Sequence, residues 1–294
     1  MKRLLWGIQA VAIFLFTLPL CIVPVRWGEF LGLVVYRLWK SRRTIALGNL
    51  KKCMELGALS TVQSPEEVIK ENFRNFGRSF IEIIRIYYGT GRSILEKTVI
   101  KGIENFEKAR AKGKGVIFLT GHCGNWELLA ILSSYKVAPL SVVVRPLNNP
   151  YLNAFLLGAR SRFGNSVIDK KGALRTILTA LKRRGNVGIL MDQAVLPEEG
   201  YVIEFLGQGA WTSKMPALLA RKTGAPAVPA FIRRTESGHE ITIHPEILLS
   251  SMGNQEEAVK EDTSRFSGFI EDYIKENPSQ WLWMHRRWKR VLPE

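Results

Sequence analysis

The sequence predicts an α/β fold in which a mixed, mostly parallel sheet is flanked by helices and preceded by an N-terminal membrane anchor helix. Two observations carry this prediction. From Gly115 onward, short apolar runs alternate with helical stretches over short connections, as in parallel strands joined by helices. Before them, the segment from Leu4 to Val25 contains no charged residue. The length of 294 residues favours one large domain behind the anchor over two.

The N-terminal segment is long enough to cross a bilayer. As a helix, residues 4–25 reach about 33 Å, close to the thickness of the hydrocarbon core. A cleaved signal peptide is the alternative, because Lys2 and Arg3 form a basic start, but no small-residue cleavage site follows. We therefore expect a retained anchor over residues 1–26 and a single domain over residues 27–294. The anchor either spans the bilayer or only dips into it.

The region after the anchor is rich in positive charge. Its basic residues outnumber the two on the amino side of the segment, and they are Arg26, Arg37, Lys40, Arg42 and Arg43. Because positive flanks stay on the cytoplasmic side, the bulk of the protein is expected in the cytoplasm. Residues 27–39 are apolar and aromatic, which suits either a helix at the headgroup level or a buried core helix.

Capping signals predict a long helix before the alternating region. Residues 65–88 form an amphipathic pattern. Ser64 is placed as its N-cap, Pro65 in its first turn, and Glu67 completes a capping box. A last helix is expected over residues 256–276.

The alternating region supplies the predicted sheet. Its apolar strand candidates, of which the last is expected at an edge, are residues 115–120, 140–145, 166–169, 187–192, 227–232 and 240–244. Helices are expected near residues 126–135, 150–163, 172–183 and 213–223. The carboxyl ends of parallel strands meet at one edge of a sheet, where α/β proteins usually hold their chemistry.

The most informative motif is Gly121-His122-Cys123-Gly124-Asn125-Trp126-Glu127, which lies at such a strand end. It places His122 in the turn and Glu127 in the first turn of the next helix. A carboxylate that steadies an imidazolium lets the histidine accept a proton from a hydroxyl group. The structural alternative is that Asn125 caps the helix and Glu127 only complements the helix dipole.

Charge and composition limit the function classes. The chain has 42 Lys and Arg against 26 Asp and Glu, a net charge of +16, which favours anionic partners such as lipid, an acidic protein or nucleic acid. Three cysteines without paired spacing fit a reducing compartment. No metal site is expected, since His239 and His244 point to opposite faces of a strand and no P-loop or dinucleotide fingerprint is present.

Six segments, taken together and in order, resemble the bacterial lipid A late acyltransferases, a branch of the His-x4-Asp/Glu glycerolipid acyltransferase superfamily. The segments are the 121–127 motif, Arg145-Pro146-Leu147-Asn148-Asn149-Pro150, Arg160 with Gly164, Asp192-Gln193, residues 205–210 with Thr212, and residues 281–289. The resemblance covers nearly the whole chain. Cys123 departs from it, because the family often has a larger or aromatic residue there.

The resemblance implies a membrane-associated O-acyltransferase. Such an enzyme moves a fatty acyl chain from acyl–acyl carrier protein to a hydroxyl of a lipid A precursor, needs no cofactor, and lies at the bacterial inner membrane. His122 is expected as the general base, Glu127 as its partner, and Arg160 as a donor to the tetrahedral oxyanion. Substrate-binding groups are expected at Arg145, Asn148, Asp192 and Gln193. A nucleophilic Cys123 is a less favoured mechanism.

Several alternatives stay open. The acceptor is alternatively another glycolipid, such as a mannosylated phosphoinositide, or a lysophospholipid. In a different class, the charge and the Trp/Arg-rich tail of residues 281–290 suit a membrane-tethered nucleic-acid-binding protein, although no nucleic-acid fold signature is found. Within this tail, residues 285–290 suit either an anionic lipid surface or packing on the core with their cations outward. A thioester hydrolase is not favoured, because no Gly-x-Ser-x-Gly elbow is present.

Overall fold

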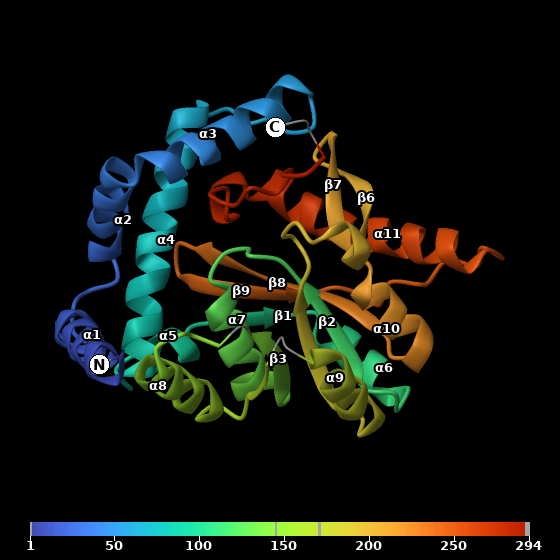
Figure 1. Cartoon of the computed structure of the whole chain (residues 1–294), viewed down its shortest axis with the longest axis horizontal. Helices are drawn as coiled ribbons and strands as arrows, with labels where there is room; N and C mark the ends of the chain where they lie inside the picture. Colours follow the sequence, from blue (N-terminus) through green and yellow to red (C-terminus); the bar gives the residue numbers. More distant parts are fainter. Residues whose placement is uncertain (1, 145, 170–171, 292–294) are drawn as a thin grey trace.

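A seven-stranded sheet forms the centre of the molecule. The computed structural model describes residues 2–144, 146–169 and 172–291 (Figure 1). The strand order is β1-β9-β8-β2-β5-β3-β4. The strands are β1 (Val99–Lys101), β2 (Val116–Thr120), β3 (Leu140–Val144), β4 (Ser166–Asp169), β5 (Asn186–Leu190), β8 (Ala227–Thr235) and β9 (Gly238–Ile243). Strands β8, β2, β5, β3 and β4 run parallel, whereas β9 is antiparallel to β8, so the prediction of a mixed, mostly parallel sheet is confirmed.

One detail of the predicted sheet is wrong. Strand β9 was expected at an edge, but β1 pairs with it in parallel register from the outside. Strand β1 has three residues, which is too short to show a period-two pattern in the sequence. A separate antiparallel hairpin of β6 (Gly200–Phe205) and β7 (Gln208–Ser213) was also not predicted.

Helices cover both faces of the sheet. They are α6 (Ile103–Ala111), α7 (Trp126–Leu132), α8 (Pro150–Ser161), α9 (Ala173–Lys182), α10 (Met215–Thr223) and α11 (Gln255–Glu276). Successive residues of β2 alternate between two hydrophobic cores, with Ile117 and Leu119 in one and Val116 and Phe118 in the other. Both faces of the sheet are therefore buried, as parallel strands require.

A layer of helices lies beside the sheet. It contains α2 (Trp27–Leu38), α3 (Lys40–Glu55), α4 (Pro65–Tyr87) and the short α5 (Arg92–Glu96). Figure 1 shows α4 running along the sheet, with α2 next to it and α3 across its end. The predicted capping box of α4 is present, since Ser64 and Glu67 exchange hydrogen bonds with each other's backbone.

Helices α2 and α4 touch through their backbones. Gly28 and Gly32, one turn apart on α2, face Gly77 of α4. A Cβ atom on Gly77 would lie 2.0 Å from the carbonyl oxygen of Gly28 and 2.6 Å from the nitrogen of Gly32. Only glycine fits this crossing, so α2 is a packed element of the fold as well as a segment close to the anchor.

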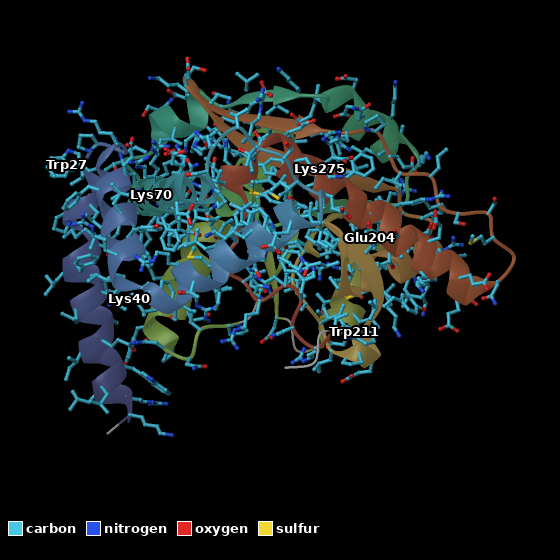
Figure 2. The ribbon with its side chains drawn as sticks, turned by 90° about the horizontal axis from the view of Figure 1, so that it is seen from above. Trp27, Lys40, Lys70, Glu204, Trp211 and Lys275 are labelled. Atoms are coloured by element: carbon cyan, nitrogen blue, oxygen red, sulfur yellow. The ribbon has the colours of Figure 1, made fainter. Side chains whose placement is uncertain are left out.

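The N-terminal helix α1 (Lys2–Thr17) packs along the domain. The Asn149 side chain at the start of α8 donates hydrogen bonds to the Trp6 carbonyl oxygen and to Gln9 Oε1, both 2.9 Å away. Phe14 contacts Phe155 of α8 edge to face at 5.1 Å. Figure 2 shows α1 reaching past the rest of the molecule at its N-terminal end.

The outer side of α1 is apolar and uncovered. Leu4, Ile8, Val11 and Leu15 are each more than half exposed. Residues Lys2–Cys21, which include the 3-10 turn Pro19–Cys21, are long and apolar enough to cross a membrane, with a mean hydropathy of 2.0 over an 18-residue window. By length and composition, this segment is one candidate for the anchor expected over residues 1–26.

The α2–α4 contact makes a testable prediction. Gly77→Ala forces the two backbones apart, so we expect a lower midpoint of thermal unfolding, equivalent to about 1–3 kcal/mol. Gly48→Ala in α3 is the matched control, because a Cβ there has no neighbour within 4 Å and Ala favours the helix. If the two substitutions have the same effect on the midpoint, the close contact does not limit stability.

Candidate active site

The register of two adjacent strands brings His122 and Asp192 together. Strands β2 and β5 are paired in parallel with Thr120 opposite Leu190. His122 and Asp192 each lie two residues beyond these partners, in the loops at the carboxyl edge of the sheet. The backbone N–H of Met191 continues the ladder by donating to the Thr120 carbonyl oxygen at 3.1 Å. The two side chains are thus fixed by the sheet itself.

The Asp192 carboxylate is buried and accepts three hydrogen bonds. Its Oδ1 faces His122 Nδ1 at 2.8 Å, and its Oδ2 accepts the His122 backbone N–H at 2.9 Å. The indole N–H of Trp281 donates to the same Oδ2 at 2.8 Å. Burial alone would raise the pKa of Asp192, but the charge and the hydrogen bonds of His122, together with the Trp281 bond, lower it. Asp192 is therefore ionised.

The ionised Asp192 sets the chemistry of the imidazole. With Nδ1–H directed at the carboxylate, Nε2 carries the free lone pair. Burial lowers the pKa of His122, but the charge and hydrogen bond of Asp192 outweigh it, so the pKa lies above its ordinary value of 6.5. The side chain keeps 20% of its surface exposed, so a reacting group can reach it. This arrangement is that of a general base.

Two further side chains lie against the ring. Gln193 Nε2 lies 3.3 Å from His122 Nε2 and 3.5 Å from its Nδ1. Trp126 contacts the ring edge to face, with the ring centres 5.0 Å apart. Asp192 and Gln193 were predicted to bind substrate. In the structure, Asp192 is instead the hydrogen-bond partner of His122, and Gln193 lies against the His122 ring.

Glu127 is not the partner of His122, and this part of the sequence interpretation is wrong. Its carboxylate is engaged by Arg160 of α8, whose Nε and Nη2 donate at 2.6 Å and 3.1 Å. The Tyr87 hydroxyl of α4 donates to the same carboxylate. The physical reason is direction: Glu127 lies on α7 and faces α8 and α4, whereas His122 turns toward β5. The structure thus brings Glu127 and Arg160 together in a second ionic group.

The loop that carries His122 needs glycine at Gly124. The φ angle of this residue is +54°, and a Cβ atom there would lie 2.1 Å from the carbonyl oxygen of Ile232 in β8. The Gly124 N–H donates to the Gln280 carbonyl oxygen at 2.6 Å. Such close backbone contact fixes the turn between β2 and α7.

The buried carboxylate of Glu82 stabilises this loop. Asn125 caps α7 by accepting the Leu128 N–H, as predicted, and its Nδ2 donates to Glu82 of α4 at 2.9 Å. Glu82 also accepts hydrogen bonds from Arg234 and from His239. Burial would raise the pKa of Glu82, but these donors lower it to about 2. The sequence offered no signal for this group, because its members come from four separate elements.

The carboxyl-terminal segment forms part of the site. The Leu282 N–H donates to the His122 carbonyl oxygen at 3.1 Å, beside the Trp281 contact with Asp192. Trp281, Trp283 and Trp288 are buried. The expectation that this segment packs on the core with its cations outward is wrong for Arg287. That residue is fully buried, and its guanidinium binds the Trp211 carbonyl oxygen and the Thr212 hydroxyl of the β6–β7 hairpin.

The remaining predicted residues are less informative. Arg145 lies outside the described residues. Asn148 is exposed, whereas its neighbour Asn149 is buried, caps α8 and donates hydrogen bonds to α1.

Cys123 is buried, and burial together with the Asp192 charge raises the pKa of its thiol well above the ordinary value. A thiol in this state is a poor nucleophile, which argues against an acyl-cysteine intermediate.

No metal-binding group is found among the described residues. Within residues 2–144, 146–169 and 172–291, no three His, Cys, Asp or Glu side chains gather in a way that could hold a metal ion. The polar groups at the sheet edge are instead the His122–Asp192 pair and the Glu127–Arg160 pair.

Comparisons with known proteins identify the type of enzyme. A lipid A biosynthesis acyltransferase of Haemophilus influenzae is 26% identical, with 97% of this chain and 88% of that protein covered. The lipid A biosynthesis lauroyltransferase of Escherichia coli is also 26% identical, with 91% and 85% covered. The phosphatidylinositol mannoside acyltransferase of Mycobacterium tuberculosis is 23% identical, with 78% and 73% covered.

A solved structure is also similar to this chain, although too distantly to support an argument. The 1-acyl-sn-glycerophosphate acyltransferase of Thermotoga maritima gives a TM-score of 0.38 at 16% identity, with 84% of this chain and 95% of that chain covered.

A histidine made basic by a buried aspartate, in a chain whose relatives are acyltransferases, defines an acyltransferase enzyme. The profile described as bacterial lipid A biosynthesis acyltransferase matches residues 3–290. The chain belongs to this family, so the family resemblance found in the sequence is confirmed.

The His122–Asp192 pair predicts a specific pH dependence. Since His122 must be unprotonated to act as a base, kcat/KM should rise with pH through an apparent pKa above 6.5. Asp192→Asn removes the negative charge that raises this pKa. The acidic side of the kcat/KM profile should therefore move to lower pH. In the same variant, kcat should fall by roughly 10²–10⁴-fold.

Asp272→Asn, at an exposed position of α11, is the matched control and should leave both quantities unchanged. An acidic side of the profile that stays in place in Asp192→Asn would show that another group titrates.

Proposed function

We propose that this enzyme transfers a fatty acyl chain from acyl–acyl carrier protein to a hydroxyl group of a lipid A precursor. The observation that carries the proposal is the hydrogen bond from His122 Nδ1 to the buried Asp192, which leaves Nε2 as the base. The relatives named as lipid A acyltransferases support the acceptor, and the net charge of +16 suits both an acidic carrier protein and a phosphorylated glycolipid.

In the proposed reaction, His122 moves one proton. Its Nε2 takes the proton of the acceptor hydroxyl as the oxygen attacks the thioester carbonyl carbon, and a tetrahedral oxyanion forms. Asp192 stabilises the imidazolium that results. When the C–S bond breaks, the imidazolium returns the proton to the thiolate, so an ester and a thiol are released. The thioester is already activated, and no cofactor is needed.

In the proposed reaction, Glu127 is no longer the partner of the base, whereas Arg160 keeps the role that was expected for it. We assign Arg160 as a donor to the oxyanion, with Glu127 and Tyr87 holding it in place. The paired hydrogen bonds between the guanidinium and the carboxylate fix the plane of the guanidinium. Little conformational freedom is then lost when the remaining N–H groups meet the developing charge.

The proposed location is the bacterial inner membrane, with the catalytic domain on the cytoplasmic side. The exposed apolar side of α1 supports membrane attachment, and the basic residues that follow it support this orientation. Phe155 of α8 contacts both Phe14 of α1 and Tyr87, whose hydroxyl donates to Glu127, so the anchor lies close to the second ionic group of the site. A lipid acceptor would then reach the site while it remains in the membrane.

The second candidate acceptor is a mannosylated phosphoinositide. The relatives named as phosphatidylinositol mannoside acyltransferases favour it, although they cover less of this chain. Both acceptors combine a sugar hydroxyl with a phosphate, so the same base chemistry applies. The two acceptors are therefore distinguished by identifying which of them the enzyme acylates.

Product analysis tests the proposal. Purified enzyme is given an acyl–acyl carrier protein and, in separate reactions, a lipid A precursor, a mannosylated phosphoinositide and a lysophospholipid, and the lipids are read by mass spectrometry. We expect the lipid A precursor to gain one acyl chain. His122→Ala should reduce this product by roughly 10²–10⁴-fold. His244→Gln, which changes a histidine between Phe231 and Phe269, is the control and should retain activity.

Acylation of another acceptor in place of the lipid A precursor would refute the proposed substrate. A folded His122→Ala enzyme with normal turnover would refute the mechanism.

A further inference from the structure

A second cleft lies next to the small cavity beside His122 and shares part of its lining. It has a volume of about 750 Å³ and is bounded by α2, α4, α5 and the β8–β9 hairpin. Its charged lining contains both signs, with the cations Arg26, Arg78, Arg85, Lys97 and Arg234 and the carboxylates Glu29, Glu71, Glu82 and Glu236. Nothing in the acyl-transfer chemistry described above uses this cleft.

The cations of the cleft differ in their ionic partners. Arg78 is paired with Glu29 and Glu71, and Arg234 is paired with Glu82, so their charges are balanced within the wall. Arg26, Arg85 and Lys97 have no acidic partner anywhere in the described ranges 2–144, 146–169 and 172–291. Across the lining, five Arg and Lys side chains face four Glu side chains, so the cleft has a small positive excess, and Arg26, Arg85 and Lys97 are the cations without an ionic partner in the described part of the chain.

Two buried atoms in the lining also lack a hydrogen-bond partner. They are Nε of Arg85 and Nδ1 of His239. The His239 side chain is 98% buried, and its other ring nitrogen is bound to Glu82. A buried N–H of a guanidinium without an acceptor is costly, and such groups usually mark the place of a missing water, ion or ligand.

The position of the cleft indicates where a ligand comes from. Val25 and Arg26 line it, and they lie four and five residues after Cys21, where the candidate membrane span ends. Figure 2 places the adjacent Trp27 at the outer edge of the molecule, on the side of α1 and α2. Asn75, Arg234 and Gln280 line both this cleft and the small cavity beside His122. The cleft thus lies between the end of the anchor and the catalytic loop.

We propose that this cleft binds the phosphate of a phosphorylated lipid headgroup. Phosphate oxygens accept charge-assisted hydrogen bonds from Arg and Lys, so one phosphate would satisfy Arg85 and balance Arg26 and Lys97. A lipid is favoured over a soluble anion because the cleft begins where the anchor ends. The inference rests on the membrane attachment included in the proposed function, and not on the identity of the acyl donor or acceptor.

The test is a direct binding measurement on the full-length protein in detergent micelles. Isothermal titration with dihexanoyl phosphatidate, dihexanoyl phosphatidylcholine and inorganic phosphate is carried out at one fixed ionic strength. We expect phosphatidate to bind most tightly. Arg85→Gln/Lys97→Gln should weaken its binding by about 20-fold, and Lys97→Gln alone, at an exposed position, by about fivefold.

The matched control is Arg92→Gln/Lys101→Gln. It removes the same charge from α5 and β1, at exposed residues paired with Glu96 and Glu240, and should change the affinity by less than about twofold. Equal weakening by both double variants would show only general attraction and would overturn the proposal. Inorganic phosphate that binds as tightly as phosphatidate, or no preference for phosphatidate over phosphatidylcholine, would also overturn it.

The titration contains no acyl donor. A wrong assignment of the transferred chain or its acceptor therefore leaves this result intact, and a failed titration leaves the acyl-transfer proposal intact.

Discussion

The site depends on one buried carboxylate. Asp192 is held by the imidazole and backbone of His122 and by the indole of Trp281, so a single ion ties together two sheet loops and the carboxyl-terminal segment. Burying an isolated carboxylate would cost several kcal/mol, and these three donors offset that cost. The same bonds select the tautomer of His122. Stability of the loop and basicity of Nε2 thus have one physical origin.

Local sequence patterns predicted the sheet and most of its helices well. The Ser64 capping box and the Asn125 cap act over three residues, and apolar runs of five residues mark the buried strands, so each signal lies within one short window. Strand β1 was missed because three residues are too few to show the period-two alternation of a strand. The partner of His122 was misassigned for a related reason: Glu127 is near in sequence, whereas Asp192 is 70 residues away and is brought close only by β2–β5 pairing.

Charge patterns were harder to interpret than apolar ones. Arg287 lies in a run of cations that looked like a solvated or lipid-facing tail, yet it is fully buried against the β6–β7 hairpin. Arg160 looked like a free donor, yet it is held by Glu127. The net charge of +16 shows that cations exceed carboxylates, but only the fold shows which cations are paired. Binding of anions depends on the unpaired ones.

The most direct measurement of the central interaction is the ¹⁵N NMR titration of His122 in labelled protein, assigned by comparison with His122→Ala. We expect the neutral ring to carry its proton on Nδ1 and the His122 pKa to lie above 6.5. Asp192→Asn should lower this pKa, whereas Glu127→Gln should leave it unchanged. A neutral ring protonated on Nε2, or a His122 pKa that responds to Glu127→Gln and not to Asp192→Asn, would contradict the role of Asp192.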